Sequence, residues 1–257
     1  MINEKVFLGL PSSFKDLTII YPPKIKDVMN EGNFNQFIYI LTMEQDEIAD
    51  KMAEDEENFT KDTIIPTPFQ MLLANCHHNE QVMKLTEQAF NFFTKEKVRI
   101  MPEQGLILFI DEKKLEEAVR NKTLKIEDLR VLKEEDFFDF QNEIRSAVGR
   151  KKIENTSDDD PRVARIKALS RKKIRIKEAI KAKKGDGISL STLMASLCCM
   201  NMGINPLNIE EISYASVGLL TRVYQEKEKF DRDMMFLANG ADSKKLKPKY
   251  WIRNIDD

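Results

Sequence analysis

Apolar residues recur at three- and four-residue intervals along most of the chain, and this spacing constrains the fold more than any other feature. Only an α-helix brings residues three and four apart onto one face, so the pattern predicts a mainly α-helical protein. The segment 80–95 is the clearest example. Its apolar residues on one face are Val82, Leu85, Ala89, Phe92 and Phe93.

Local end signals accompany several of the predicted helices. Thr67 is a suitable N-cap and Pro68 suits the first helical position, where a missing N–H is harmless. Thr42-Met-Glu-Gln45 has the form of a capping box and predicts the start of an acidic helix, and Gly149 predicts a helix end. The remaining helices are predicted at about 34–41, 69–78, 111–119, 133–148, 188–202 and 206–239.

Two segments of the N-terminal half favour β-structure. Residues 98–110 read as two short strands around a Pro-Glu-Gln-Gly turn, and Leu17–Tyr21 reads as one short strand ended by Pro22. The predicted fold class is therefore mainly α, with a small β-hairpin in the N-terminal half and a helical C-terminal part.

A short polar segment predicts the domain organisation. Residues 155–161 contain no apolar side chain apart from proline, which is typical of a linker. We therefore expect an N-terminal domain over 1–153, a linker over 154–160 and a C-terminal helical region over 161–257.

Composition argues against a membrane protein and against an oxidising compartment. The chain is 42% hydrophobic and 33% charged, and no stretch reaches the roughly 18 consecutive apolar residues of a membrane span. The N-terminus does not have the form of a signal peptide. The three cysteines cannot all pair with one another, and Cys198 and Cys199 are adjacent in a helical pattern, so we expect a cytoplasmic location.

Charge is distributed unevenly, although the formal net charge is only −2. Residues 44–58 hold eight acids and one base, whereas residues 162–184 hold eleven bases and one acid. The basic segment has two interpretations. Its charge favours binding to nucleic acid phosphates, with Arg171, Lys172, Lys173 and Arg175 at its centre, but its isoleucines and leucine also form a stripe typical of a helix that binds an acidic protein surface.

Motifs that would indicate an enzyme are missing from the sequence. There is no Gly-x-Ser-x-Gly elbow, no phosphate-binding loop and no dinucleotide fingerprint. Cys76, His77 and His78 are adjacent, and neighbouring helical side chains diverge by about 100°, so they cannot easily converge on a metal. We expect a protein that is not an enzyme and that needs no cofactor or metal.

The C-terminal third resembles the C-terminal ends of accessory proteins encoded by phages of Gram-positive bacteria, including tail-assembly chaperones. The resemblance covers roughly residues 188–254. It is carried by Ser189-Leu-Ser-Thr-Leu-Met194, Asn208-Ile-Glu-Glu-Ile-Ser-Tyr214, Leu237-Ala-Asn-Gly-Ala-Asp242 and Lys249-Tyr-Trp251.

The resemblance implies a non-enzymatic assembly or structural accessory protein in the host cytoplasm or on the virion. Its implied partners are other phage structural or tail proteins, such as the tape-measure protein, and self-association is a further option; no membrane partner is implied. The residues that we expect to contact a protein partner are Tyr214, Leu219, Tyr224, Phe230, Met234, Met235, Phe236, Tyr250 and Trp251.

The alternative function, nucleic-acid binding by residues 162–184, has a direct test. If it holds, affinity for DNA or RNA should fall steeply as salt rises, because phosphate contacts release counterions. Reversing the charge of Arg171, Lys172, Lys173 and Arg175 should then abolish the binding measured by fluorescence anisotropy. Absence of binding at low salt would remove this alternative.

Overall fold

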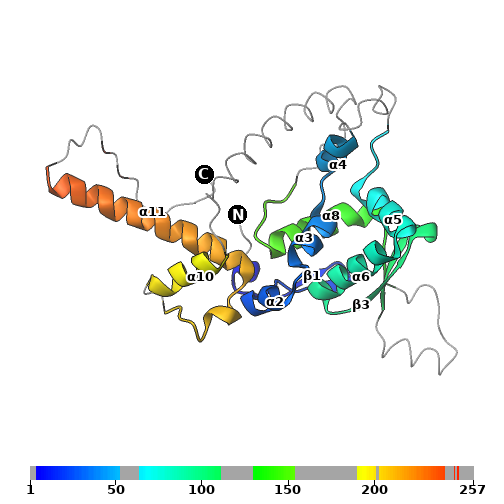
Figure 1. Ribbon diagram of the computed structural model, residues 1–257, viewed down its shortest axis with the longest axis horizontal. Coiled ribbons are helices and arrows are strands. Elements are labelled where there is room, and N and C mark those ends of the chain that lie inside the picture. The colour runs from blue at the N-terminus through cyan, green and yellow to red at the C-terminus, as the bar shows by residue number, and fades with distance from the viewer. Residues whose placement is uncertain are drawn as a thin grey trace.

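The structure is a computed structural model in which most of the chain can be described (Figure 1). Several predicted features lie outside the described residues: the linker, the basic segment, the helix expected at 111–119 and the tail around Trp251. The described residues are 4–52, 64–110, 130–153, 190–200 and 203–240, together with Leu246 and Pro248.

Helices dominate the described residues and β-structure is confined to two small antiparallel sheets in the N-terminal half, so the predicted fold class is confirmed. The strands are β1 (Ser12–Phe14), β2 (Thr18–Ile20), β3 (Lys97–Met101), β4 (Leu106–Ile110) and β5 (Arg130–Leu132). The helices are α1 (Glu4–Phe7), α2 (Ile25–Asn30), α3 (Phe34–Thr42), α4 (Gln45–Met52), α5 (Pro68–His78), α6 (Glu80–Thr94), α8 (Glu134–Ala147), α10 (Leu190–Cys199) and α11 (Tyr214–Ala238), with 3-10 turns η1 (Pro102–Gln104) and η3 (Ile209–Glu211).

Helices α5 and α6 form a hairpin whose ends are determined by local side chains. The Thr67 hydroxyl accepts a hydrogen bond from the Gln70 backbone N–H at 3.2 Å, and Pro68 occupies the first helical position, as predicted. Asn79 ends α5 and begins α6, since its side-chain oxygen accepts from the backbone N–H groups of Gln81 and Val82. A single residue therefore joins the two helices, which forces them to pack against each other.

The predicted β-hairpin is present and belongs to a three-stranded sheet with the order β3-β4-β5. Val98 lies opposite Phe109, and the turn includes Gly105 at φ +68°. Strand β5 adds Arg130–Leu132 to the edge of β4 and was not predicted. Three residues carry too little periodicity to indicate a strand, so this pairing depends on the tertiary structure.

Phenylalanine side chains form the centre of the main core. Phe90 of α6 stacks on Phe140 of α8 with ring centroids 5.2 Å apart, and both side chains are 0% exposed. Phe14 of β1 meets Phe140 edge to face at 5.4 Å, and Phe109 of β4 meets Phe90 at 6.1 Å. These rings join two helices and both sheets into one buried cluster.

A second, smaller core joins the C-terminal helices to the N-terminal segment. It contains Ile25 of α2, Leu197 of α10, Ile209 of η3 and Val217 of α11, all of which are buried. Segments that are almost 200 residues apart in sequence therefore share one apolar cluster. Figure 1 shows α10 beside α11, while the C-terminal end of α11 extends away from the other labelled elements.

Two predicted helix starts were wrong. Thr42 does not cap α4, because it is the last residue of α3 and its hydroxyl donates to the Ile38 carbonyl at 2.7 Å. The helix expected from Pro206 begins at Tyr214 instead, after the short turn η3. In the second case, the side chains of Asn208 and Asn205 accept hydrogen bonds from the backbone N–H groups of Asn205 and Leu207, so this segment forms turns before the helix begins.

The packing of Phe140 leads to a prediction about stability. Phe140→Ala should lower the free energy of unfolding by about 3–5 kcal/mol, because it leaves a cavity between four aromatic rings, those of Phe14, Phe90, Phe109 and Phe137. Urea denaturation would measure the loss. Phe140→Leu should cost less, and Met29→Ala at a 59% exposed position should change stability by no more than about 0.5 kcal/mol. A similar loss for Phe140→Ala and Met29→Ala would contradict the assignment of the core.

Candidate protein-binding site

The first turns of α11 are attached to the N-terminal segment by backbone hydrogen bonds. The Ile25 N–H donates to the Ile212 carbonyl at 2.9 Å, and the Tyr214 N–H donates to the Pro23 carbonyl at 2.8 Å. The Ser216 hydroxyl donates to the Phe7 carbonyl at 2.7 Å. These bonds determine where α11 begins and in which direction it leaves the core.

Two ion pairs reinforce the same junction. The Glu211 carboxylate receives the ammonium groups of Lys24 and Lys26, each at 2.5 Å. Hydrogen bonds from Lys24 and then Lys26 stabilise the charged carboxylate and lower the pKa of Glu211 from 4.5 to about 2. Because these side chains are solvent-exposed, the pairs orient η3 against α2 but contribute modestly to stability.

Tyr214, the first of the expected partner contacts, lies at this junction. Its half-buried ring meets Phe34 of α3 edge to face, with centroids 5.0 Å apart. It also packs against both apolar cores. Its position indicates an intramolecular role in holding α11 to α3, while a contact with a partner stays a prediction.

Three further expected contacts, Leu219, Tyr224 and Phe230, lie half-buried along the middle of α11. The Tyr224 hydroxyl donates to Glu228 Oε1 at 2.7 Å, and this hydrogen bond raises the pKa of Tyr224 because it stabilises the protonated hydroxyl. Lys227 pairs with Asp231 one turn later, also at 2.7 Å. The surface of this part of α11 therefore carries both apolar side chains and paired charged side chains.

The last turn of α11 carries the most exposed of the expected contacts that the structure describes. Met234, Met235 and Phe236 are 45%, 59% and 46% exposed, and together we refer to them as the α11 tip. Consecutive helical residues point about 100° apart, so the three side chains surround much of the helix end. The helix ends two residues later at Ala238, and Gly240 follows with φ +89°. The α11 tip is thus an apolar surface at the far end of an extended helix (Figure 1).

The other predicted contacts cannot be placed. Tyr250 and Trp251, and the basic residues Arg171, Lys172, Lys173 and Arg175, lie outside the described residues. Their roles stay predictions.

The cysteine beside the two histidines is poorly suited to nucleophilic chemistry. Cys76 is buried, and its burial raises the pKa of its thiol, while His77 and His78 are exposed. Within the described residues, no three His, Cys, Asp or Glu side chains come close enough to hold a metal ion. No described helix has the length and hydrophobicity that crossing a membrane requires.

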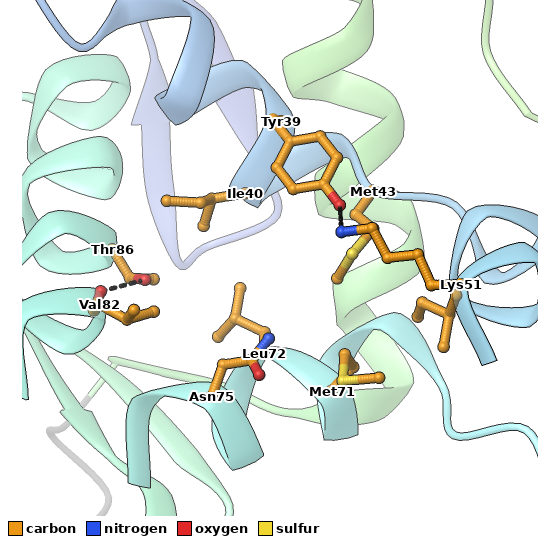
Figure 2. Close-up of a pocket in the computed structure, with 10 residues that line it drawn as sticks. Tyr39, Ile40, Met43, Lys51, Met71, Leu72, Asn75, Val82 and Thr86 are labelled. Carbon is orange, nitrogen blue, oxygen red and sulfur yellow. Dashed lines mark hydrogen bonds between the residues drawn. The ribbon is translucent and has the colours of Figure 1, made fainter. Parts of the chain in front are cut away.

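One feature that the sequence did not indicate is a partly open cavity lined by residues of α3, α4, α5 and α6 (Figure 2). Its volume is about 220 Å³, and Tyr39 and Lys51 lie at one edge of it. The spacing of apolar residues in the sequence cannot predict such a cavity, because the cavity is a gap in the packing of side chains from four helices.

Comparison with known proteins gives a family match in the C-terminal part of the chain. Residues 181–256 match the family model described as YomV second domain, a phage- or prophage-like protein family. The matched segment includes α10, η3 and α11, and it covers less than a third of the 257-residue chain. No curated protein and no solved structure matches the chain. The match indicates a phage-associated protein and agrees with the C-terminal phage resemblance.

The junction at Glu211 leads to a prediction about pH. A carboxyl whose pKa is lowered on folding stabilises the protein fully above its ordinary pKa, and this stabilisation is lost as pH falls through the folded value. The melting temperature of Glu211→Gln should therefore lie below that of the wild type above pH 5, and the difference should shrink between pH 4.5 and about 2.

Differential scanning calorimetry of both proteins across this range would measure the effect. Glu210→Gln is the matched control, because it removes a neighbouring carboxylate without removing an ion pair to Lys24 or Lys26. A difference between wild type and Glu211→Gln that stays constant down to pH 2 would show that the ion pairs do not form.

Proposed function

We propose that the chain is a phage assembly or structural accessory protein that binds another phage protein through the distal half of α11 and catalyses no reaction. The observation that carries this proposal is the α11 tip, an exposed apolar surface within the segment that matches a phage-associated family.

The chemistry of the tip suits protein binding. Exposed apolar residues that cluster, rather than occurring singly, mark interaction surfaces. Methionine side chains are flexible and polarisable, so Met234 and Met235 can adapt to a partner groove, and Phe236 supplies a large rigid contact. An extended helix that inserts its apolar end into a groove is a common mode of recognition.

The charged middle of α11 supports the same proposal. Between Tyr224 and the tip, acids and bases alternate, including the Lys227–Asp231 pair. Such charges add little affinity, but they select the register of a partner and increase the rate of encounter. Apolar anchors at the end and charges behind them resemble the core and rim of a protein interface.

The family match suggests which proteins the tip would bind. A phage-associated protein meets other phage proteins during assembly, and the proposed partners are structural or tail proteins. The more specific proposal is a tail-assembly chaperone that holds an apolar segment of the tape-measure protein until the tail forms. The protein would act in the host cytoplasm and could remain on the virion.

A capture experiment tests this proposal. Met234, Met235 and Phe236 would be replaced together by serine in the full chain, which would be used as bait in lysate of phage-infected host cells, with and without nuclease. The wild type should recover a phage structural or tail protein in near-stoichiometric, nuclease-resistant amounts, identified by mass spectrometry. The triple variant should recover at least about tenfold less, because buried apolar anchors dominate binding energy.

A matched control replaces three exposed apolar residues elsewhere, Met29, Ile64 and Leu207, which are 59%, 87% and 94% exposed. This control should capture the partner as the wild type does. Equal capture by both triple variants would argue against the α11 tip, and loss of all capture on nuclease treatment would favour nucleic-acid binding.

A further inference from the structure

The cavity between α3, α4, α5 and α6 has one predominantly apolar wall and one polar edge. Helices α5 and α6 form its floor and one side, and α3 and α4 close it from the other side (Figure 2). The apolar residues that line it are Ile40, Met43, Ile48, Met71, Leu72 and Val82.

The polar edge is formed by Tyr39 and Lys51. The Lys51 ammonium donates a hydrogen bond to the Tyr39 hydroxyl and lies 4.8 Å from the centroid of the Tyr39 ring. Lys51 carries the only charge among the described residues that line the cavity. An ammonium has three N–H donors, and Tyr39 accepts one of them. The Tyr39 hydroxyl, as an acceptor in this bond, keeps its own proton to donate.

The other polar residues of the lining are Asn75 and Thr86, and both are uncharged. The Thr86 hydroxyl donates to the Val82 carbonyl at 2.7 Å within α6, on the side of the cavity opposite Lys51 (Figure 2). Among the described lining residues, the positive charge that favours an anionic group lies at one edge, on Lys51 beside Tyr39. Apart from Asn75 and Thr86, the rest of the lining favours an apolar group.

The volume limits the ligand to a small molecule. An apolar cavity of about 150 Å³ accommodates benzene, whereas pockets for drug-sized molecules occupy about 300–1,000 Å³. The volume here, about 220 Å³, lies between the two. It suits an apolar group of roughly six to ten carbons.

We infer that this cavity binds a small amphipathic carboxylate, with its apolar chain against Leu72, Met71 and Val82 and its carboxylate on the Lys51 ammonium and the Tyr39 hydroxyl. Charge-assisted hydrogen bonds to an ammonium are about twice as strong as neutral ones, so the carboxylate distinguishes this ligand from an alcohol of equal length. The site does not involve α11 and is independent of the proposed partner binding.

The probe for this inference is sodium octanoate, titrated into the full-length protein by isothermal titration calorimetry and followed by amide NMR shifts. Octanoate should bind one to one and at least about tenfold more tightly than 1-octanol or octylammonium, a difference of about 1.4 kcal/mol. The largest NMR shifts should fall on residues of α3, α4, α5 and α6.

Three variants make the test specific. Lys51→Met keeps an unbranched side chain that is one heavy atom shorter and removes the charge, so it should abolish the preference for octanoate over octanol. Met71→Trp should fill the cavity and block both ligands, and Val82→Phe provides a second filling variant if Met71→Trp does not fold. Lys84→Met, on the exposed surface of α6 outside this cavity, is the matched charge control and should bind octanoate normally.

Equal affinity of the wild type for octanoate, octanol and octylammonium would overturn the inference. So would octanoate binding that a folded cavity-filling variant leaves unchanged, or the absence of binding to the wild type.

Discussion

A connected set of buried phenylalanine rings holds the two small sheets and the helices α6 and α8 together. Phe14, Phe90, Phe109 and Phe140 come from β1, α6, β4 and α8, and no two of these elements are neighbours in sequence. Each buried ring contributes about 1.5–3 kcal/mol through removal from water, and each ring pair adds about 0.5–1.5 kcal/mol. This cluster orients α6, and through the shared residue Asn79 it also orients α5. The floor of the cavity beside Lys51 is therefore built on the aromatic core.

The second constraint is the junction between the N-terminal segment and the start of α11. Pro23 and Ile25 exchange backbone hydrogen bonds with Tyr214 and Ile212, so the first turn of α11 is held against α2. The helix contains 25 residues and extends about 1.5 Å per residue, so its far end lies well beyond this attachment. The length of α11 and its attachment at one end together account for the exposure of the α11 tip. The proposed binding surface is thus a consequence of where the helix is anchored.

Sequence patterns located the longer helices and the strands β2, β3 and β4, but they did not indicate the strands β1 and β5. Helices α5, α6 and α8 follow the predicted spacing, because a period of three to four residues is repeated several times in each. Strands β1 and β5 contain three residues each and become strands only by pairing with β2 and β4. Sequence spacing also does not show which of the expected contact residues on α11 are buried. Tyr214 and Phe236 look alike as aromatic residues of one helix, yet Tyr214 packs on Phe34 and Phe236 faces solvent.

Local sequence patterns predict the mainly α-helical fold class, the β3–β4 hairpin and the ends of α5 and α6. These features depend on residues within a few positions of one another, such as Thr67 with Gln70 and Asn79 with Val82. Contacts between distant segments establish which end of α11 is attached, which of its aromatic residues are covered, and that Tyr39 and Lys51 meet beside an apolar cavity. Those outcomes depend on contacts between distant segments, and a local pattern cannot specify which of several apolar faces a helix will bury.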